Sequence, residues 1–185
     1  MTTLLVGIVL FFSVHAIPML PGVKSAALAR LGEKRFKGLF SLFAMAGFLA
    51  IIFGMKAAPF QPLWQPPAWS PTVTNLAMPV AFCLLVAAYV PSNFRRIFSN
   101  PMLSAVLLWS LAHLVANGDL ASLLLFGSFG IFSIVDIISV NTRSTIAVAA
   151  KKPVYYDGLV VVIGLVAFWT VRYFHASLFG VAVAY

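Results

Sequence analysis

Charged residues are scarce in this sequence. Of its 185 residues, 9% are charged and 62% are hydrophobic, whereas a soluble domain has roughly 25% charged and 45–50% apolar residues. This composition excludes an ordinary water-soluble domain. The apolar runs have about the 20 residues that a helix needs to cross hydrocarbon, and they lack the two-residue alternation of a barrel strand. The sequence therefore predicts an all-α, polytopic transmembrane helical bundle.

Cysteine and the common catalytic motifs are also missing. Cys83 is the one cysteine, so neither an intramolecular disulfide nor a cysteine-ligated iron–sulfur cluster can form within the chain. The sequence contains no phosphate loop, no G-x-G-x-x-G, no G-x-S-x-G and no H-E-x-x-H. These absences exclude nucleotide chemistry of the soluble type.

Acidic residues are few, with four against twelve Lys and Arg, which gives a net charge of +8. In a soluble protein this excess would suggest nucleic acid. Here the basic residues cluster in short connections between apolar segments, which is the pattern of membrane topology. We therefore expect the lipid bilayer, with anionic lipid at its surface, as the partner, and no nucleic acid.

The apolar runs predict a single transmembrane domain over residues 1–185. It has about six spans, at residues 2–20, 39–55, 74–90, 102–116, 120–140 and 158–182. Ten of the twelve Lys and Arg fall in the first, third and fifth connections, so both termini are expected outside. Residues 23–37 are expected to form a cytoplasmic loop, or a short interfacial helix.

The second connection, residues 56–73, is rich in proline and contains Trp64 and Trp69. No helix tolerates this density of proline. We expect an outside loop whose tryptophans lie at the level of the lipid headgroups, where indoles are enriched. The alternative is an aromatic lid over an outer cavity.

Residues 110–122 are the predicted working centre. They place His113, Asn117, Gly118 and Asp119 between two apolar runs. Polar groups in hydrocarbon are costly, so they mark functional sites by default. The short span that carries His113 either tilts in thinned lipid or breaks inside the membrane beside a cavity.

All three histidines, His15, His113 and His175, fall within predicted spans. Each one alone can be a packed histidine that donates to a backbone carbonyl, but imidazole also binds iron, copper and zinc. At 1.5 Å per residue from the cytoplasmic ends, their depths are roughly 9, 16 and 25 Å. The depths favour His15 and His113 as a pair of metal ligands, with His175 as the alternative ligand.

Two carboxylates complete the predicted cofactor-binding set of His15, His113, His175, Asn117, Asp119 and Asp136. Asp136 comes out at roughly 6 Å deep by the same count, near His15, where it would accept the ring N–H. Its alternative is an ion pair with Arg143. Asp119 and Arg172 both lie toward the outer side, where they would neutralise each other.

A pattern of these residues runs nearly the length of the chain. It consists of His15, Arg30 with Gly32-Glu33-Lys34-Arg35-Phe36 and Ser41, Asn100-Pro101, Trp109 with His113 and Asn117-Gly118-Asp119, and His175 with Leu178-Phe179-Gly180. In this pattern the chain resembles the NnrU family of bacterial membrane proteins. The run His-x-x-x-Asn-Gly-Asp is its most specific part.

The resemblance implies a multi-pass protein of the bacterial inner membrane, linked to nitric oxide and nitrite reduction. The family is similar to the zeta-carotene isomerase, which uses haem b for a redox-gated isomerisation of a lipophilic polyene. What this implies is haem b held by histidines from the set His15, His113 and His175, in an isomerase or a nitric-oxide-responsive protein. The alternative is a non-catalytic assembly or maturation factor for nitrite and nitric oxide reductases.

A more distant resemblance is to the membrane methyltransferases of isoprenylcysteine and phospholipids. Those proteins carry Arg-His-Pro ahead of a late span, where this chain has Ser99-Asn100-Pro101. Asn is a poor haem ligand and is not protonated, so a role of that histidine does not transfer. Asp157 is the one carboxylate of the fifth connection, which also argues against a lipid methyltransferase.

Overall fold

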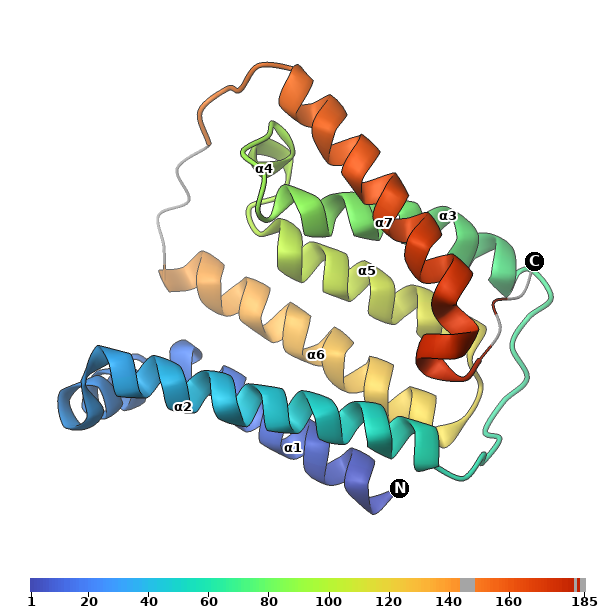
Figure 1. Cartoon of the computed structure of the whole chain (residues 1–185), viewed down its shortest axis with the longest axis horizontal. Coiled ribbons are helices and arrows are strands. Elements are labelled where there is room, and N and C mark those ends of the chain that lie inside the picture. The colour runs from blue at the N-terminus through green and yellow to red at the C-terminus, as the bar shows by residue number, and fades with distance from the viewer. Residues whose placement is uncertain (144–148, 182, 184–185) are drawn as a thin grey trace. The chain divides into compact units, whose positions relative to one another are not determined.

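The described chain is all-helical (Figure 1). The structure is a computed structural model that describes residues 1–143, 149–181 and 183. Its elements are α1 (Thr2–Ala16), η1 (Ile17–Met19), α2 (Pro21–Ala57), α3 (Ser70–Ala87), α4 (Phe94–Ile97), α5 (Pro101–Ala116), α6 (Leu120–Arg143) and α7 (Tyr155–Phe179). Five of the helices in the described part are long and apolar enough to cross a membrane. The predicted helical membrane class is therefore confirmed, while the orientation of the termini stays a prediction.

The predicted fourth span, residues 102–116, is the short helix α5. Its 16 residues extend about 24 Å, which is less than the roughly 30 Å of a hydrocarbon core. The Asn100 side-chain oxygen accepts a hydrogen bond from the Leu103 N–H at 3.2 Å, and Pro101 occupies the first helical position. Asn100-Pro101 is thus a helix start, because asparagine caps and proline opens helices well.

The loop expected at residues 23–37 is wrong, because this segment is helical. Helix α2 begins at Pro21, and its backbone leaves the helical region only at Gly32, with φ 72° and ψ 161°. Glycine populates positive φ without a Cβ penalty, whereas the alanine, leucine, lysine and arginine around it favour helix. The interfacial-helix alternative is therefore closer to the structure. The last residue of the predicted sixth span, Ala182, lies outside the described residues.

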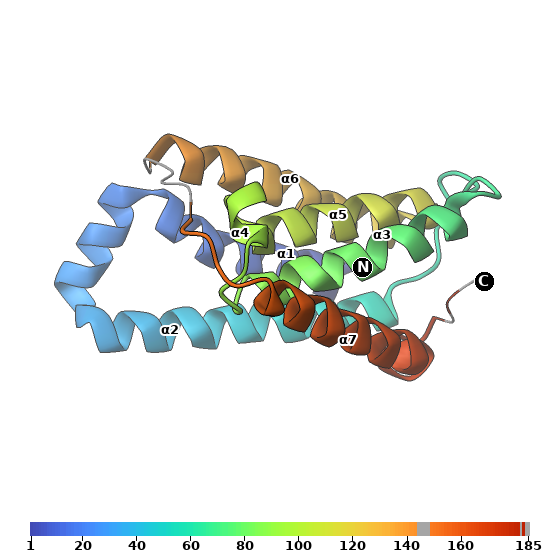
Figure 2. The same ribbon diagram turned by 90° about the horizontal axis from the view of Figure 1, so that it is seen from above.

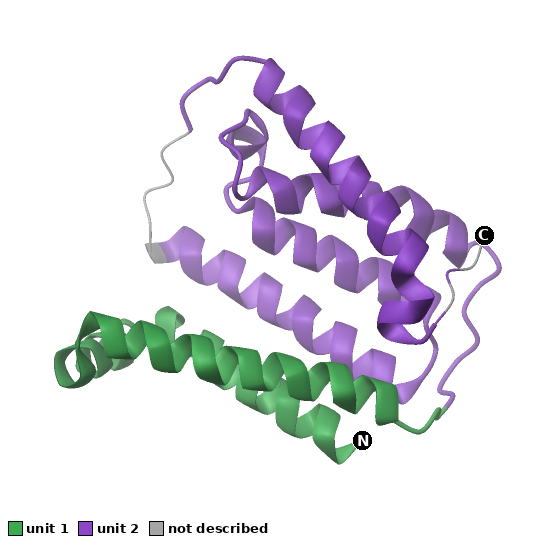
Figure 3. Cartoon of the chain, in the orientation of Figure 1, with its two compact units in different colours: residues 1–61 green, residues 62–185 purple. Residues whose placement is uncertain are grey.

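The chain divides into two compact units, residues 1–61 and 62–185 (Figure 3). Unit 1 is an antiparallel pair of helices, α1 and α2, that meet through glycines. A Cβ added at Gly47 would lie 2.8 Å from the Phe11 backbone nitrogen, and one at Gly7 would lie 2.6 Å from that of Ile51. Close backbone approach at small residues is how transmembrane helices associate. The prediction of one domain over the whole chain stays a prediction.

Unit 2 is a row of four antiparallel helices (Figures 1 and 2). Helix α6 packs on α5, α5 on α3, and α3 on α7. The α3–α7 contact is centred on Gly164, where an added Cβ would lie 2.8 Å from the Cα of Cys83. Cys83, Ala87 and Val160 form the buried core there. This row brings the start of α3, the end of α5 and the end of α7 together.

Candidate functional site

A cavity of about 230 Å³ lies in unit 2 where these three helix ends meet. Its polar lining comprises Thr74 and Asn75 of α3, His113 of α5 with Asn117, and Arg172 and His175 of α7. Its apolar walls include Met78, Phe82, Phe168 and Val171. Two of the three predicted metal-ligating histidines therefore share one cavity.

His113 is held in one orientation and one tautomer. Its Nδ1 lies 2.9 Å from the Trp109 carbonyl oxygen, one turn back along α5. Because a carbonyl only accepts, Nδ1 carries the proton, and in the neutral ring Nε2 is the basic nitrogen. The ring stacks on Phe126 of α6, with centroids 4.6 Å apart and planes 29° apart. The imidazole therefore keeps a nitrogen suited to metal binding.

His175 has the same arrangement with a different partner. Its Nδ1 lies 2.7 Å from the Val181 carbonyl oxygen. Gly180 has φ 78° and ends α7 in the left-handed conformation, which reverses the chain and returns Val181 toward α7. Val181 and Val183 also line the cavity. His175 thus likewise has Nε2 as its basic nitrogen, and it lines the same cavity as His113.

A hydrogen bond between side chains joins α3 and α7 beside the two imidazoles. An Arg172 guanidinium nitrogen donates to Asn75 Oδ1 at 2.5 Å, and the guanidinium carbon lies 5.8 Å from the centre of the Trp169 ring. The first contact fixes a positive charge at the cavity wall, and the second is at cation–π distance. The sequence reasoning missed Asn75, although a polar residue inside the predicted span 74–90 is a signal of function.

Asn117, Gly118 and Asp119 form the joint between α5 and α6. The backbone N–H and side-chain Nδ2 of Asn117 both donate to the His113 carbonyl, at 2.9 and 2.8 Å. Asp119 is buried, and its Oδ1 accepts from the Ser122 N–H at 3.0 Å. These bonds satisfy groups that helix ends leave unpaired. Asn117 also lines the cavity, whereas the geometry gives Asp119 a capping role, and its cofactor role stays a prediction.

Gly118 fixes the proline-rich connection to this joint. Its carbonyl oxygen accepts from the Leu63 N–H at 2.7 Å and from the Trp64 N–H at 3.1 Å. An added Cβ at Gly118 would overlap the Trp64 carbonyl oxygen. Glycine is therefore required at this position by the close approach of the connection.

His15 belongs to unit 1. Its Nδ1 lies 2.7 Å from the Phe11 carbonyl oxygen, and its ring stacks on Phe11 with centroids 4.0 Å apart. Its predicted pairings with His113 and with Asp136 would join the two units, so they stay predictions. The side chain of Arg143, the alternative partner of Asp136, lies outside the described residues. Within the described part of the chain, no group of three or more His, Cys, Asp or Glu could hold a metal ion.

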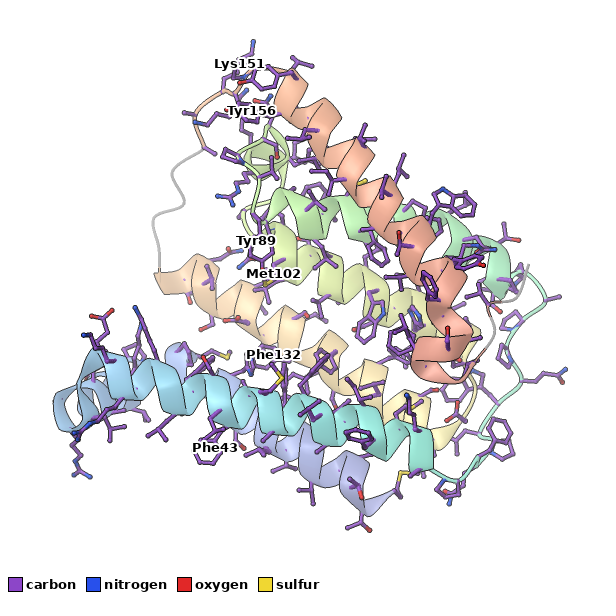
Figure 4. The ribbon with its side chains drawn as sticks, viewed as in Figure 1. Phe43, Tyr89, Met102, Phe132, Lys151 and Tyr156 are labelled. Carbon is purple, nitrogen blue, oxygen red and sulfur yellow. The ribbon has the colours of Figure 1, made fainter. Side chains whose placement is uncertain are left out.

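A separate polar cluster lies at the other end of unit 2, where α7 begins near Lys151 and Tyr156 (Figure 4). Asn93 donates to both carboxylate oxygens of Asp157, through its backbone N–H and its Nδ2, each at 2.7 Å. Asn93 also exchanges two hydrogen bonds with the Lys152 backbone, at 2.8 and 2.9 Å. The carboxylate of the fifth connection therefore holds the fold together, which further argues against methyl transfer.

Replacing Asn93 with alanine is expected to destabilise unit 2 by about 2–3 kcal/mol, because it removes the side-chain hydrogen bonds to Asp157 and to the Lys152 backbone. The backbone N–H of residue 93 still donates to Asp157. The melting temperature in detergent should fall by about 4–12 °C. Asn141→Ala, at an exposed position of α6, is the matched control and should change it by less than about 2 °C. Equal melting temperatures for the two variants would show that the cluster adds no stability.

Comparison with known protein families finds a match over nearly the whole chain. The family described as NnrU protein matches residues 3–183. Among the curated proteins and the solved structures, none matches the chain.

Proposed function

This chain belongs to the NnrU family, and from that membership and the paired histidines we propose that it is a membrane protein that binds haem b through His113 and His175. The observation that carries the proposal is that both imidazoles line one cavity and direct Nδ1–H to a backbone carbonyl. Metal-ligating histidines commonly donate their second ring N–H in this way. His15, which the sequence favoured as the partner of His113, is here the alternative ligand.

The residues of the cavity fit the chemistry of this cofactor. Neutral imidazole is a common ligand of haem iron, and the walls near Phe82 and Phe168 are apolar. Arg172 offers a guanidinium, which pairs well with a carboxylate such as that of a porphyrin side chain. The volume of about 230 Å³ is below the roughly 300–1,000 Å³ of ligand pockets. The cavity is therefore smaller than a whole porphyrin, and binding would require it to widen.

When bound, haem supplies a one-electron redox centre and a site for small diatomic ligands. The chain holds the two imidazoles in the ligating tautomer, offers a positive charge and shields one side with aromatic rings. Such a centre would serve either to sense nitric oxide or to gate the isomerisation of a lipophilic polyene. A bacterial inner membrane and nitrogen-oxide reductases as partners belong to the same proposal.

The test is the visible spectrum of the purified full-length protein after reconstitution with haem b, with and without dithionite. We expect a Soret band in the unmodified protein and in His15→Ala. His113→Ala and His175→Ala should each reduce the bound haem more than tenfold, because each would remove one of the residues proposed to hold the iron.

No Soret band in the unmodified protein with ample haem would overturn the proposal. Loss of haem in His15→Ala but not in His175→Ala would assign the second ligand to His15. The melting temperature of each variant, measured without haem, separates loss of a ligand from loss of the fold.

The second candidate is a non-catalytic assembly factor. It is favoured by the joint of Asn117 and Asp119, whose polar groups cap helices, and by the packing of His113 on Phe126. Under this function, His113→Ala lowers the stability or the capture of a nitrogen-oxide reductase, and no variant binds haem.

A further inference from the structure

Helix α2 of unit 1 bends (Figure 2), and its non-helical residue is Gly32. A small hollow lies beside this residue. The hollow is lined by Lys24, Leu28, Glu33, Phe36 and Lys37. Leu28 and Phe36 are half-buried, whereas the three charged residues are exposed. The hollow therefore has an apolar base and a charged rim.

Positive charge dominates the segment around the bend at Gly32. Residues 21–37 contain five Lys and Arg and a single acidic residue, Glu33. Lys24 comes from the segment before the break and Lys37 from the segment after it, so the bend brings two ammonium groups to one hollow. Lys37 Nζ lies 2.6 Å from Glu33 Oε1. This hydrogen bond and the charge of Lys37 lower the pKa of Glu33, so Glu33 is ionised at neutral pH and competes for Lys37.

On the predicted topology, this bend lies at the level of a bilayer surface. The apolar run of α2 begins directly after it, at residues 39–55. Helix α1 packs antiparallel on that run through Gly47 and Gly7. A ligand that fits the whole hollow needs two chemical groups, because the charged rim favours a phosphate and the apolar base favours hydrocarbon. A soluble anion would interact with the charged rim only.

We propose that this hollow binds the headgroup of an anionic phospholipid, with Lys24 and Lys37 on the phosphate and with Leu28 and Phe36 against the upper acyl chain. Lysine is a phosphate binder that acts as a point charge. Basic residues at a membrane surface each attract anionic lipid by an amount that corresponds to about fivefold in affinity. The site is independent of the haem proposal, because it lies in unit 1 and uses none of the cavity residues.

The test uses the full-length protein in nanodiscs of phosphatidylcholine with phosphatidylglycerol, and counts the retained phosphatidylglycerol by native mass spectrometry. Lys24→Gln with Lys37→Gln should reduce retention about 25-fold, at about fivefold per lysine. Arg30→Gln with Arg35→Gln removes the same charge outside the hollow, and it should reduce retention less than the lysine double variant does, because these two residues do not line the hollow. Glu33→Gln should increase retention, because it releases Lys37.

Equal losses in the two double variants would show diffuse attraction by net charge and would overturn the site. Unchanged retention in the lysine double variant would overturn it too. Inorganic phosphate, added at the molar amount of the lipid, should not displace phosphatidylglycerol, and displacement would assign the hollow to a soluble anion. Melting temperatures in pure phosphatidylcholine check folding, which exposed substitutions should leave within about 2 °C.

Discussion

Gly118→Ala is expected to destabilise unit 2 by about 3 kcal/mol or more, because the added methyl group has no room. Its Cβ would overlap the Trp64 carbonyl oxygen and lie 3.1 Å from Pro66 Cδ. The connection cannot simply withdraw, since its N–H groups at Leu63 and Trp64 donate to the Gly118 carbonyl. The melting temperature in detergent should fall by about 6–12 °C.

Gly158→Ala is the matched control for this change. A Cβ at Gly158 would meet nothing within 4 Å, and alanine is a better helix former than glycine by about 1 kcal/mol. The control should therefore keep or raise the melting temperature. If Gly118→Ala behaved like its control, the close approach of the proline-rich connection to the α5–α6 joint would be wrong.

Gly164→Val is expected to separate α7 from α3. The new Cβ would lie 2.8 Å from both Cα and Sγ of Cys83 and 2.9 Å from its backbone nitrogen. Because two of these atoms are backbone, the whole helix must shift, at a cost of about 3 kcal/mol. The same two helices carry Asn75 and Arg172 on the cavity wall, so the variant should also bind haem more weakly if the proposed function holds.

The rate at which the Cys83 thiol is labelled measures this separation directly. It is the one cysteine of the sequence and is buried, so a maleimide should label the unmodified protein slowly. In Gly164→Val the labelling rate should rise more than tenfold, because the contact that covers the thiol opens. Gly158→Val, on the same helix at a position with open space, should leave the rate unchanged, and equal rates in the two variants would contradict the packing.

The helices could be predicted from the sequence because the length of an apolar run decides whether a helix crosses a membrane. The helical structure of residues 23–37 could not be predicted in this way. Charged residues indicate that a segment is exposed to solvent, but they do not show whether it is helical. Only the single glycine at position 32, with its positive φ, interrupts the helix there. Gly32 was visible in the sequence, but glycine inside a helical pattern does not reveal whether the chain bends.

Some of the residues that line the cavity were named from the sequence, such as His113, Asn117 and His175, whereas Asn75 was not. Placing His113 in a polar centre led to the cavity, but the depth count favoured His15 over His175 as its partner. That count assumes helices that run straight across the membrane, whereas α7 crosses α3 at an angle (Figure 1). Its Arg172 reaches Asn75 near the start of α3. Asn117 and Asp119 looked functional because polar groups are costly in lipid, but a short helix also needs such groups to cap its ends.

The length of α5 sets where His113 meets water. The helix ends one turn after His113, at Asn117, and its roughly 24 Å falls short of a bilayer core. If α5 begins at the cytoplasmic edge of the core, as the predicted topology has it, the outer solution would reach inward to this end of the helix. Proton exchange at the imidazole would then take place with the outside medium, and a small diatomic gas or nitrite would reach the cavity without first dissolving in the acyl chains.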